Sequence, residues 1–444
     1  MIDKLPINWE WIPLGEYVEN HDAARVPVSS KEREKRQGKY LYYGASGVID
    51  QIDGYTHQGE YLLLGEDGAN LLARSKPIAF LAKGKFWVNN HAHVLKCRGE
   101  APNAYLAYYL NRIDLAPYVT GTAQPKLSQA KMNKIPIPVA PLDQQKGIVA
   151  EIEKQFSRLD EAVASLKRVK ANLKRYKAAV LKAAVEGKLT EDWRKQHPDV
   201  EPASKLLERI LVERRTKWDG KGKCQEPEAP DATGLPLLPK GWTWARLEQL
   251  GVIFGGLTKN PKRAKLARKL PYLRVANVYA NQLRLDEIEH IGVQDSELDK
   301  LLLRKGDLLV VEGNGSKDQI GRLAIWDGSI DPCVHQNHLI KVRLVVGLMN
   351  KWILFWLLSP VGRHFIEEVS SSTSGLYTLS VNKVGDLPII VPPLAEQEQI
   401  IAEVERRLSV IDELEAAVEA NLTRAARLRQ SILSQAFSGG WSKS

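Results

Sequence analysis

Two stretches rich in lysine and arginine are the parts of this chain whose residue types point most directly to chemistry. Residues 258–274, TKNPKRAKLARKLPYLR, contain no acidic residue and seven basic ones: Lys259, Lys262, Arg263, Lys265, Arg268, Lys269 and Arg274. Residues 25–39 contain a comparable group, diluted by Glu32 and Glu34: Arg25, Lys31, Arg33, Lys35, Arg36 and Lys39. Such side chains contact phosphate oxygens and can also read guanine edges. A solvated loop could have the same composition, but we predict that these residues contact DNA, its phosphates more than its bases.

Two histidines in the first half raise the question of a metal site. His91 and His93 alternate along a β-like run, residues 87–97, and could share a metal on one face of a strand. No carboxylate or cysteine lies at ligand spacing in the sequence, so we predict a structural role and no metal. A weak match between the two halves aligns the Asn-His pair at 90–91 with another at 337–338.

The sequence contains none of the common catalytic motifs. It has no G-x-x-x-x-G-K-[ST] phosphate loop, no G-x-G-x-x-G after a strand, and no Asn-Pro-Pro-aromatic or Asp-Pro-Pro-Tyr motif of an amino-methyltransferase. We therefore predict that the chain is not an enzyme and binds no cofactor. The rival interpretation is a fused nuclease or methyltransferase whose motifs are not recognisable, and activity of the isolated chain would reveal it.

The composition is that of a globular protein with a basic surplus. The chain has 444 residues, enough for two domains with their own cores, and a formal net charge of +10. That charge suits a polyanionic partner without proving one. Cys97, Cys224 and Cys333 form no CxxC pair, which argues for a reducing compartment. With no secretion signal, and no strongly apolar run longer than 352–358, we expect a cytoplasmic protein that does not contact a membrane.

The elements that must position these residues are doubled. Residues 127–187 return without a gap at 379–439, and 21 of the 61 aligned positions are identical. Each copy passes from a short β-like run, through Pro-x-Pro or Pro-Pro, into a long helical pattern. A second motif, LP-x-x-W-x-W-x-x-L, opens each half at residues 5 and 238. We expect this motif to start a strand with one of its two tryptophan rings packed on the core, rather than to form a platform that stacks with bases.

Between these repeats lie two variable segments, 15–126 and 248–378. Both contain short β-like runs punctuated by glycine, such as GEYLLLGEDG in the first and GDLLVVEGNG in the second. Each also contains one predicted helix, at 102–113 and at 347–369. Each variable segment is therefore interpreted as one mixed α/β domain.

The two long helical patterns, which begin near residues 142 and 394, each carry an apolar seam that repeats every seven residues. The seam residues are Ile152, Leu159, Leu166, Leu173 and Val180 in the first helix and Val404, Ile411, Val418, Ala425 and Ile432 in the second. We expect Phe156, Val163 and Tyr176 to fill the alternate turns of the first seam. Heptad spacing is typical of a coiled coil, and such a helix is not stable with its seam exposed.

Charge order predicts how the two helices pair. The first helix is acidic-leaning over 143–161 and basic over 167–188, while the second is acidic over 396–419 and basic beyond it. Antiparallel packing places each acidic half against a basic half. We therefore predict a mixed α/β fold with two globular α/β domains separated by two long helices, which form an antiparallel coiled coil with pseudo-two-fold symmetry. Charge gradients that merely suit helix dipoles are the rival explanation, but dipole effects fade beyond the terminal turns.

These features divide the chain into four parts. We place the first globular domain at 1–141, a central helical connector at 142–234, the second globular domain at 235–393 and a distal helical connector at 394–444. The central connector is expected to add a short amphipathic helix over 203–217 and, after it, a linker rich in proline and glycine.

The chain as a whole resembles the specificity subunit of type I restriction–modification systems. The resemblance rests on the paired LP-x-x-W-x-W motifs, Tyr-Gly-Ala-Ser at 43–46, GDLLVV at 306–311, the stretches IPIPVAPLDQQKGIV and LPIIVPPLAEQEQII, and the helix ends VLKAAVEGKLTEDW and ILSQAFSGGW. It implies two target-recognition domains, each reading one half of a bipartite sequence in double-stranded DNA. It further implies helices that act as a ruler and dock two DNA-methyltransferase (modification) subunits, with restriction/motor subunits joining the complex.

Two departures from the family pattern stand out. Gln144-Gln145 replaces the Glu-Gln pair that Glu396-Gln397 retains, and the second half lacks a counterpart of 190–234. Beside the type I assignment we keep two alternatives: a specificity subunit of another bipartite-recognising restriction class, and a coiled-coil assembly protein with no DNA role. The identity of the partner subunits would distinguish the first alternative from the type I assignment. Salt-dependent, sequence-specific retention of DNA would exclude the second.

Overall fold

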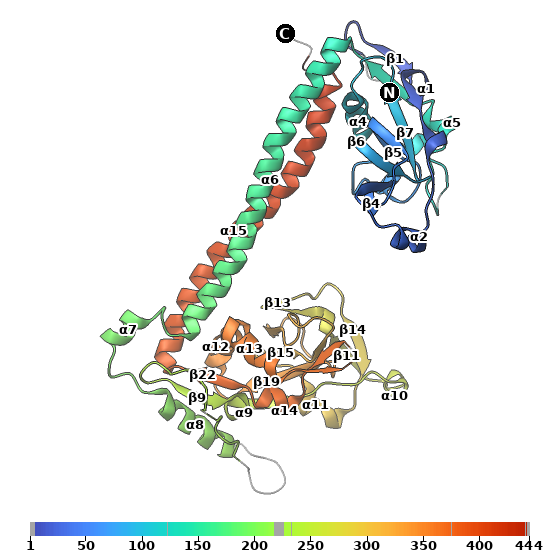
Figure 1. Ribbon diagram of the computed structural model, residues 1–444. Helices are drawn as coiled ribbons and strands as arrows, with labels where there is room; N and C mark the ends of the chain where they lie inside the picture. Colours follow the sequence, from blue (N-terminus) through green and yellow to red (C-terminus); the bar gives the residue numbers. More distant parts are fainter. Residues whose placement is uncertain are drawn as a thin grey trace. The chain divides into compact units, whose positions relative to one another are not determined.

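The computed structural model describes residues 5–121, 123–216, 226–231, 233–373, 375–439 and 441. The chain divides into two compact units: unit 1 comprises Met1–Val169 and Ala417–Ser444, and unit 2 comprises Lys170–Ala416. Each unit contains one β-rich head and one end of a pair of long helices (Figure 1). Part of the predicted proline- and glycine-rich linker, together with Cys224, lies outside the described residues.

The head of unit 1 is built on a six-stranded sheet with the order β2-β7-β5-β6-β3-β4. Its strands are β2 Val18–Asn20, β3 Tyr40–Gly44, β4 Gly47–Ile52, β5 His57–Gly65, β6 Ala79–Val88 and β7 Ala92–Cys97. β3 and β6 run parallel, while the other neighbours are antiparallel. The short elements around the sheet are α1 Leu14–Tyr17, η1 Asp22–Ala24, α2 Ser30–Lys35, α3 Asn70–Ala73, η2 Ala116–Tyr118 and α5 Gln129–Met132.

The central strand β5 is covered on both faces. Because successive side chains of a strand point to opposite sides, Leu62 and Leu64 enter the main core of the head while Leu63 enters a second cluster with Phe86. The main core lies under α4 (Asn103–Arg112), which agrees with the helix predicted at 102–113. This double coverage explains why the strand has a nearly continuous apolar sequence.

The repeated motifs of the two halves meet as strand pairs. In unit 1, β1 (Glu10–Pro13) pairs antiparallel with β8 (Pro136–Val139). In unit 2, β9 (Thr243–Arg246) pairs in the same way with β22 (Pro388–Val391). Trp9 and Trp242, which precede these strands, are buried at 7% and 8% exposure, as predicted for core tryptophans. Each pair joins the start of a head to the start of the long helix that follows it.

The head of unit 2 divides its strands among smaller sheets. Their orders are β10-β19-β15-β17, β14-β11-β18, β12-β13 and β16-β21-β20. The strands are β10 Gly251–Phe254, β11 Lys269–Leu273, β12 Val278–Tyr279, β13 Gln282–Leu283, β14 Glu289–Gly292, β15 Leu308–Val311, β16 Gly313–Asn314, β17 Leu323–Ile325, β18 Val334–His335, β19 Leu339–Leu344, β20 Ser371–Thr373 and β21 Leu376–Thr378. The shorter helices are α9 Leu247–Leu250, α10 Pro261–Ala264, η3 Val275–Asn277, η4 Asp295–Glu297, α11 Leu298–Leu301, η5 Gly347–Met349 and α14 Val381–Gly385.

The predicted helix at 347–369 is in fact two helices, α12 (Asn350–Leu358) and α13 (Pro360–Val369). Pro360 cannot continue the first helix because it lacks a backbone N–H, and Ser359 starts the second by accepting a 3.1 Å hydrogen bond from the Gly362 N–H. The apolar run of α12 is buried in the head. No helix in the part of the chain that the structure describes is long and apolar enough to cross a membrane.

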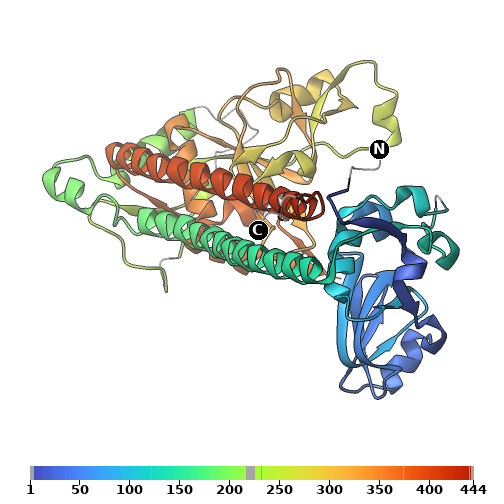
Figure 2. The same cartoon turned by 90° about the horizontal axis from the view of Figure 1, so that it is seen from above.

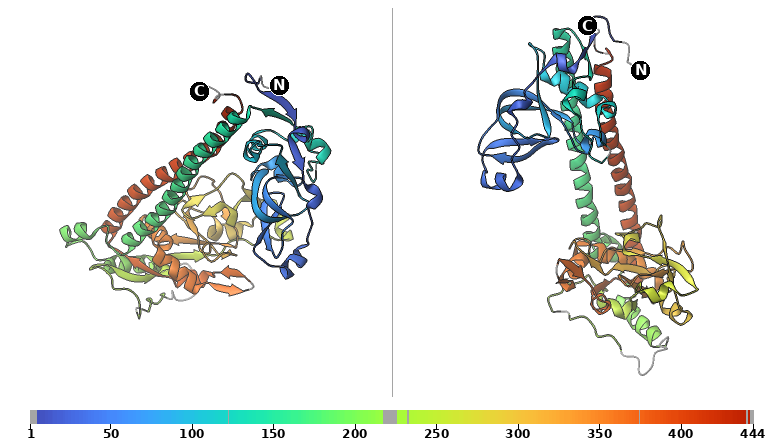
Figure 3. Two further views of the ribbon diagram at one scale, coloured as in Figure 1. Left: turned by 45° about the horizontal axis from the view of Figure 1, so that its top comes forward. Right: turned by 90° about the vertical axis from the view of Figure 1, so that its right-hand side faces the viewer.

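The two long helices are α6 (Leu142–Val185) and α15 (Leu394–Ala436), and they lie side by side (Figures 1 and 2). Asp160 of α6 forms an ion pair with Arg429 of α15 in unit 1. Lys177 lies 2.9 Å from Asp412 in unit 2. Moving 17 residues forward along α6 therefore moves 17 residues back along α15, which is an antiparallel register. The predicted antiparallel pairing is confirmed, and Figure 3 shows it from two further directions.

The seam residues lie between the two helices. One residue that was expected to lie beside the seam does not. Leu166 is half-buried, and these seam residues are buried: Ile152, Leu159, Leu173, Val180, Val404, Ile411, Val418, Ala425 and Ile432. Tyr176 was expected in the first seam, but its side chain is 50% exposed. Phe156 follows the seam residue Ile152 by four positions and lies beside the seam. Tyr176 follows the seam residue Leu173 by only three positions, and its side chain is turned outward.

Two further helices follow α6 in unit 2. α7 (Glu191–Gln196) was not predicted, because its six residues are too few to show a helical period. α8 (Ala203–Thr216) matches the amphipathic helix predicted at 203–217 as far as the described residues extend. Leu206 and Ile210 are buried where α8 packs on α9 and β9.

Candidate nucleic-acid interface

The basic stretch of unit 2, residues 258–274, folds around one short helix and one strand. The side chain of Asn260 caps α10 by accepting a 3.1 Å hydrogen bond from the Arg263 N–H. β11 follows and pairs antiparallel with β14, which brings the stretch beside residues 289–297. The stretch is therefore an ordered part of the head rather than a loose loop.

Most basic residues of this stretch are paired with acids that lie further along the chain. The ion pairs are Arg263–Glu297 at 2.6 Å, Arg274–Glu289 at 2.7 Å, Lys259–Glu289 at 2.8 Å and Arg268–Asp295. A hydrogen bond from Lys259 lowers the pKa of Glu289, and one from Arg263 lowers the pKa of Glu297. The stretch has no acid of its own, but β14 and η4 supply its counter-charge in the folded head. Lys262, Lys265 and Lys269 are exposed and have no ion-pair partner among the residues that the structure describes.

The basic stretch of unit 1, residues 25–39, likewise contains both ion-paired and unpaired residues, and here all the paired ones are arginines. The arginine pairs are Arg25–Glu66 at 2.6 Å, Arg33–Asp50 at 2.8 Å and Arg36–Asp53 at 2.8 Å. Two of these guanidinium groups also lie over aromatic rings, Arg33 4.8 Å from the centre of Tyr42 and Arg36 4.9 Å from that of Trp87. The lysines are exposed: Lys31, Lys35 and Lys39. Arg33 and Arg36 thus hold α2 against the sheet, while the lysines stay at the surface.

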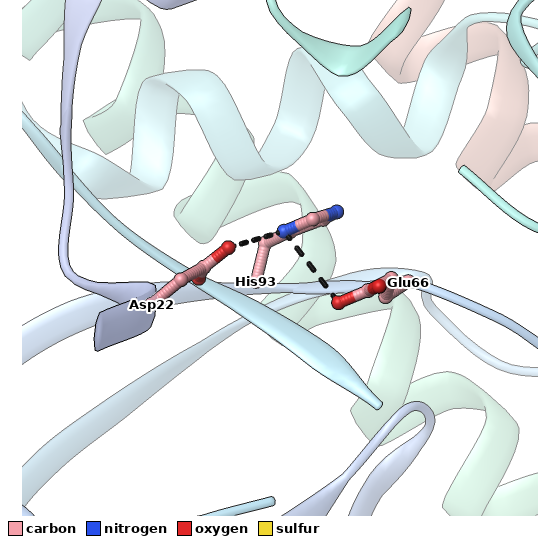
Figure 4. Close-up of side chains that lie close together, drawn as sticks. All are labelled: Asp22, Glu66 and His93. Carbon is pink, nitrogen blue, oxygen red and sulfur yellow. Dashed lines mark hydrogen bonds and ion pairs between the residues drawn. The ribbon is translucent and has the colours of Figure 1, made fainter. Parts of the chain in front are cut away.

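His93 belongs to a buried ion-pair network with Asp22 and Glu66 (Figure 4). Its Nδ1 lies 2.6 Å from Asp22 and 3.8 Å from Glu66, and its Nε2 lies 2.9 Å from the Leu127 carbonyl oxygen. Arg25 contacts both carboxylates, at 3.3 and 2.6 Å. Burial alone would raise the pKa of Asp22, but the hydrogen bond and charge of His93, the Val94 N–H and the charge of Arg25 together outweigh burial and lower that pKa.

These three side chains could offer ligand atoms to a metal, but Arg25 already supplies the positive charge. A metal ion would have to displace its guanidinium group and also Lys126, whose Nζ lies 3.2 Å from Glu66. The network therefore favours the structural role predicted for His93. The acids that surround it come from residues 22 and 66, too far away in sequence to be recognised at ligand spacing.

His91 has a different environment, which recurs in the other head. Its Nδ1 lies 2.8 Å from Asp67, and in unit 2 the Nδ1 of His338 lies 3.0 Å from Glu312. The two imidazoles are 47% and 54% exposed. Sequence reasoning aligned the two histidines but missed their acids. A signal was present, since an acidic residue follows the apolar strand in both GEYLLLGEDG and GDLLVVEGNG.

Each unit also contains a groove between its head and a long helix. In unit 1 the groove has a volume of about 1170 Å³ and lies between α4 and the helix pair, with Tyr108 and Phe156 in its lining. In unit 2 a groove of about 540 Å³ lies between α12 and α15, lined by Phe355 and Leu408. Phe156 and Leu408 correspond through the repeat, because they are separated by the same 252 positions as the long helices. The two grooves therefore occupy equivalent places.

Comparison with known proteins gives consistent matches. Residues 6–175 match the family described as "Type I restriction modification DNA specificity domain". The chain is 28% identical to the EcoKI specificity subunit of Escherichia coli (strain K12), over 70% of this chain and 59% of that protein. It is 41% identical to a putative type I specificity subunit of Haemophilus influenzae, over 32% of this chain and 35% of that protein. It is 22% identical to the EcoDI specificity subunit of Escherichia coli, over 98% of this chain and 89% of that protein. The chain thus matches less than two thirds of the length of the first two relatives.

Two solved structures share the fold. A chain from a structure that describes complex assembly and conformational transition of the type I R-M system has a TM-score of 0.62 at 18% identity, with 98% of both chains covered. The HsdS subunit from Thermoanaerobacter tengcongensis has a TM-score of 0.50 at 17% identity, again with 98% of both chains covered. These likenesses confirm the predicted fold of two mixed α/β heads and two long helices. Residues 6–175 thus carry a type I restriction modification DNA specificity domain, and the chain as a whole is similar to type I specificity subunits.

Proposed function

We propose that the chain is a non-catalytic, sequence-specific DNA-binding subunit of a type I restriction–modification complex. Its target-recognition domains are 1–141 and 235–393, each reading one half of a bipartite site in double-stranded DNA. The helical connectors are 142–234 and 394–444. The observation that carries this proposal is the doubling of one architecture: the same strand pairing joins each head to its long helix, while the sequences of the heads differ.

Phosphate contact falls mainly to the lysines of the two basic stretches. An exposed lysine without an ion-pair partner can replace a counterion on DNA without first breaking a protein contact. The lysines proposed for this role are Lys31, Lys35, Lys39, Lys262, Lys265 and Lys269. The other predicted contact residues, most of them arginines, act chiefly by holding the stretches in shape through their acids, namely Arg25, Arg33, Arg36, Lys259, Arg263, Arg268 and Arg274.

The helix pair is proposed to set the gap between the two half-sites. At 1.5 Å per residue, the 44 residues of α6 extend roughly 65 Å. A helix of that length bends little when a second helix covers its seam. The length of DNA between the half-sites would then follow from the number of helical residues between the heads.

The equivalent grooves support two copies of one partner. Two modification subunits are proposed to dock there, since the same kind of groove recurs beside α4 and beside α12. They would supply the methylation chemistry that this chain is proposed to lack, and restriction/motor subunits would join the complex. Cys97 and Cys333 are free thiols, which fits a complex in the reducing environment of the cytoplasm.

Methylation of genomic DNA by the purified chain with its modification subunits tests the proposal. The expected result is methylation confined to one bipartite sequence, and no methylation or cleavage by the chain alone. The triple variant K262E/K265E/K269E should strongly reduce modification, because it reverses the free charges of one head. A control with the same charge change on α6, on α7 and on the turn between them, K182E/K188E/K195E, should retain the wild-type pattern.

Other outcomes identify the rival functions. Catalysis by the isolated chain would establish an enzyme. Selective DNA binding with partners of a different type would establish another restriction class. Assembly with partners but no DNA retention at any salt concentration would establish a scaffold without a DNA role.

A further inference from the structure

Each head exposes one histidine whose ring is oriented by a carboxylate. The pairs are His91–Asp67 in unit 1 and His338–Glu312 in unit 2, with Nδ1 facing the acid at 2.8 and 3.0 Å. Among the residues that the structure describes, neither Nε2 has a hydrogen-bond partner. Since about half of each side chain is exposed, Nε2 is the polar ring atom available to a ligand.

The backbone holds the two histidines in the same way. Glu66 N–H donates to the His91 carbonyl and Glu312 N–H to the His338 carbonyl, both at 2.9 Å. The carbonyls of Glu66 and Glu312 in turn accept hydrogen bonds from later segments, from Leu127 N–H at 2.7 Å and from Leu379 N–H at 2.8 Å. The histidines therefore occupy equivalent positions in two heads whose sequences have otherwise diverged.

The acids, in contrast, come from positions that are not equivalent. Glu312 and Glu66 are equivalent by their main-chain hydrogen bonds. The Glu66 carboxylate, however, already forms ion pairs with Arg25 and Lys126. In unit 1 the next residue, Asp67, takes over the contact with His91. The two heads thus form the same His–carboxylate pair with acids from non-equivalent positions. This indicates that the pair is retained for its chemistry and not merely inherited with the backbone.

Stability does not explain the pair. Exposed ion pairs contribute about 0–1 kcal/mol, and both of these histidines lie at the surface. The histidine loop is already held by main-chain hydrogen bonds, and in unit 1 also by Asn89, which accepts from the His91 N–H at 2.9 Å. A role toward a ligand accounts for the exposure of both rings and for the free Nε2.

We propose that His91 and His338 each donate a hydrogen bond from Nε2 to a phosphate oxygen of DNA. This inference rests on the proposed function, in which the two heads read different half-sites. A side chain that both heads share is suited to contact a part of DNA that does not depend on sequence. The phosphate is such a part, whereas a base edge is not. A ring placed between a carboxylate and a phosphate carries both protons, one for each anion, and such charge-assisted bonds are short and strong.

The test is DNA binding by the full chain with its modification subunits, as a function of salt, on specific and non-specific duplexes. His91→Ala and His338→Ala should each lower affinity for both duplexes by roughly tenfold and reduce the salt slope by about one. Asp67→Asn and Glu312→Gln should act in the same direction. The matched control is His364→Ala on α13, an exposed histidine 4.0 Å from Glu368 that has no counterpart in the other head, and it should bind as wild type.

The outcomes separate this inference from the proposed function. A wild-type complex that selects no sequence contradicts the proposed function. If wild type is selective but the histidine variants match it in affinity and salt slope, only the phosphate contact is wrong. A variant that changes the preferred bases of one half-site also overturns it, in favour of base reading. Circular dichroism and thermal unfolding of each variant exclude a folding defect, and the two heads provide two independent tests.

Discussion

The indole Nε1 of Trp242 donates a 2.8 Å hydrogen bond to Glu396, whose side chain has no exposed surface. The same carboxylate accepts hydrogen bonds from Thr190 and Arg194, both at 2.7 Å. At the equivalent place in unit 1, Trp9 donates at 2.9 Å to the neutral amide oxygen of Gln144. Glu396-Gln397 and Gln144-Gln145 differ only slightly in sequence. In the structure, however, the contact between head and long helix is charged in unit 2 and uncharged in unit 1.

Removal of Arg194 should destabilise unit 2. Arg194→Ala leaves the Glu396 carboxylate buried without a positive partner, so we expect a loss of about 3–5 kcal/mol in the free energy of unfolding. Urea unfolding of the full chain measures it. The double variant Arg194→Ala/Glu396→Gln copies the neutral join of unit 1 and should recover most of the loss. Equal stabilities of the single and double variants would contradict this account.

The helix pair should depend on its seam and not on neighbouring apolar residues. Ile411 is 1% exposed in the seam, so Ile411→Ala should cost about 2–5 kcal/mol of unfolding free energy. Val410, the adjacent residue, is 51% exposed, and Val410→Ala should change stability by less than about 0.5 kcal/mol. Denaturant unfolding compares them, and similar losses in both variants would argue against the seam.

Unit 2 should become more stable between pH 8 and pH 10 because of Lys341. Burial, followed by the charge of Arg343, lowers the pKa of Lys341 from its usual 10.5 to about 8. Between these values the unfolded chain holds a proton that the folded chain has lost, so the free energy of unfolding rises with pH. The rise from pH 7.5 to 9.5 should be about 1–2 kcal/mol greater than in Lys341→Met. Identical pH profiles would contradict the assignment.

Within the basic stretch of unit 2, lysine and arginine variants should behave differently. Lys262→Ala and Lys265→Ala should weaken DNA binding and reduce its salt slope while leaving stability unchanged, because these side chains are exposed. Arg263→Ala should lower stability, by about 1–3 kcal/mol, because it leaves Glu297 without its two-point partner. Salt titrations of DNA binding and thermal unfolding separate the two effects. If Arg263→Ala affected binding alone, the structural role of the arginine would be wrong.

The antiparallel helix pair could be predicted because its evidence repeats along the chain. The heptad spacing recurs along each helix, and the single change from acidic to basic in each helix gives the direction of pairing. The ion pairs that cancel the basic stretches could not be predicted in this way. Glu289 and Glu297 reach Arg274 and Arg263 only because β14 pairs with β11 in one particular register. A shift by one residue would turn Glu289, which lies in β14, to the other face of the sheet.

The sequence by itself thus determined the doubling of the chain, the helix pair and its direction, and the resemblance to type I specificity subunits, because periodicity and repetition survive without knowledge of contacts. The tertiary structure alone decided which charges are free. It paired the arginines with distant acids, left the lysines exposed, and gave His91 and His338 equivalent positions with acids from different sites. The physical reason is that a charge acts over a few ångströms in space, and strand register sets those distances, whatever the separation along the chain.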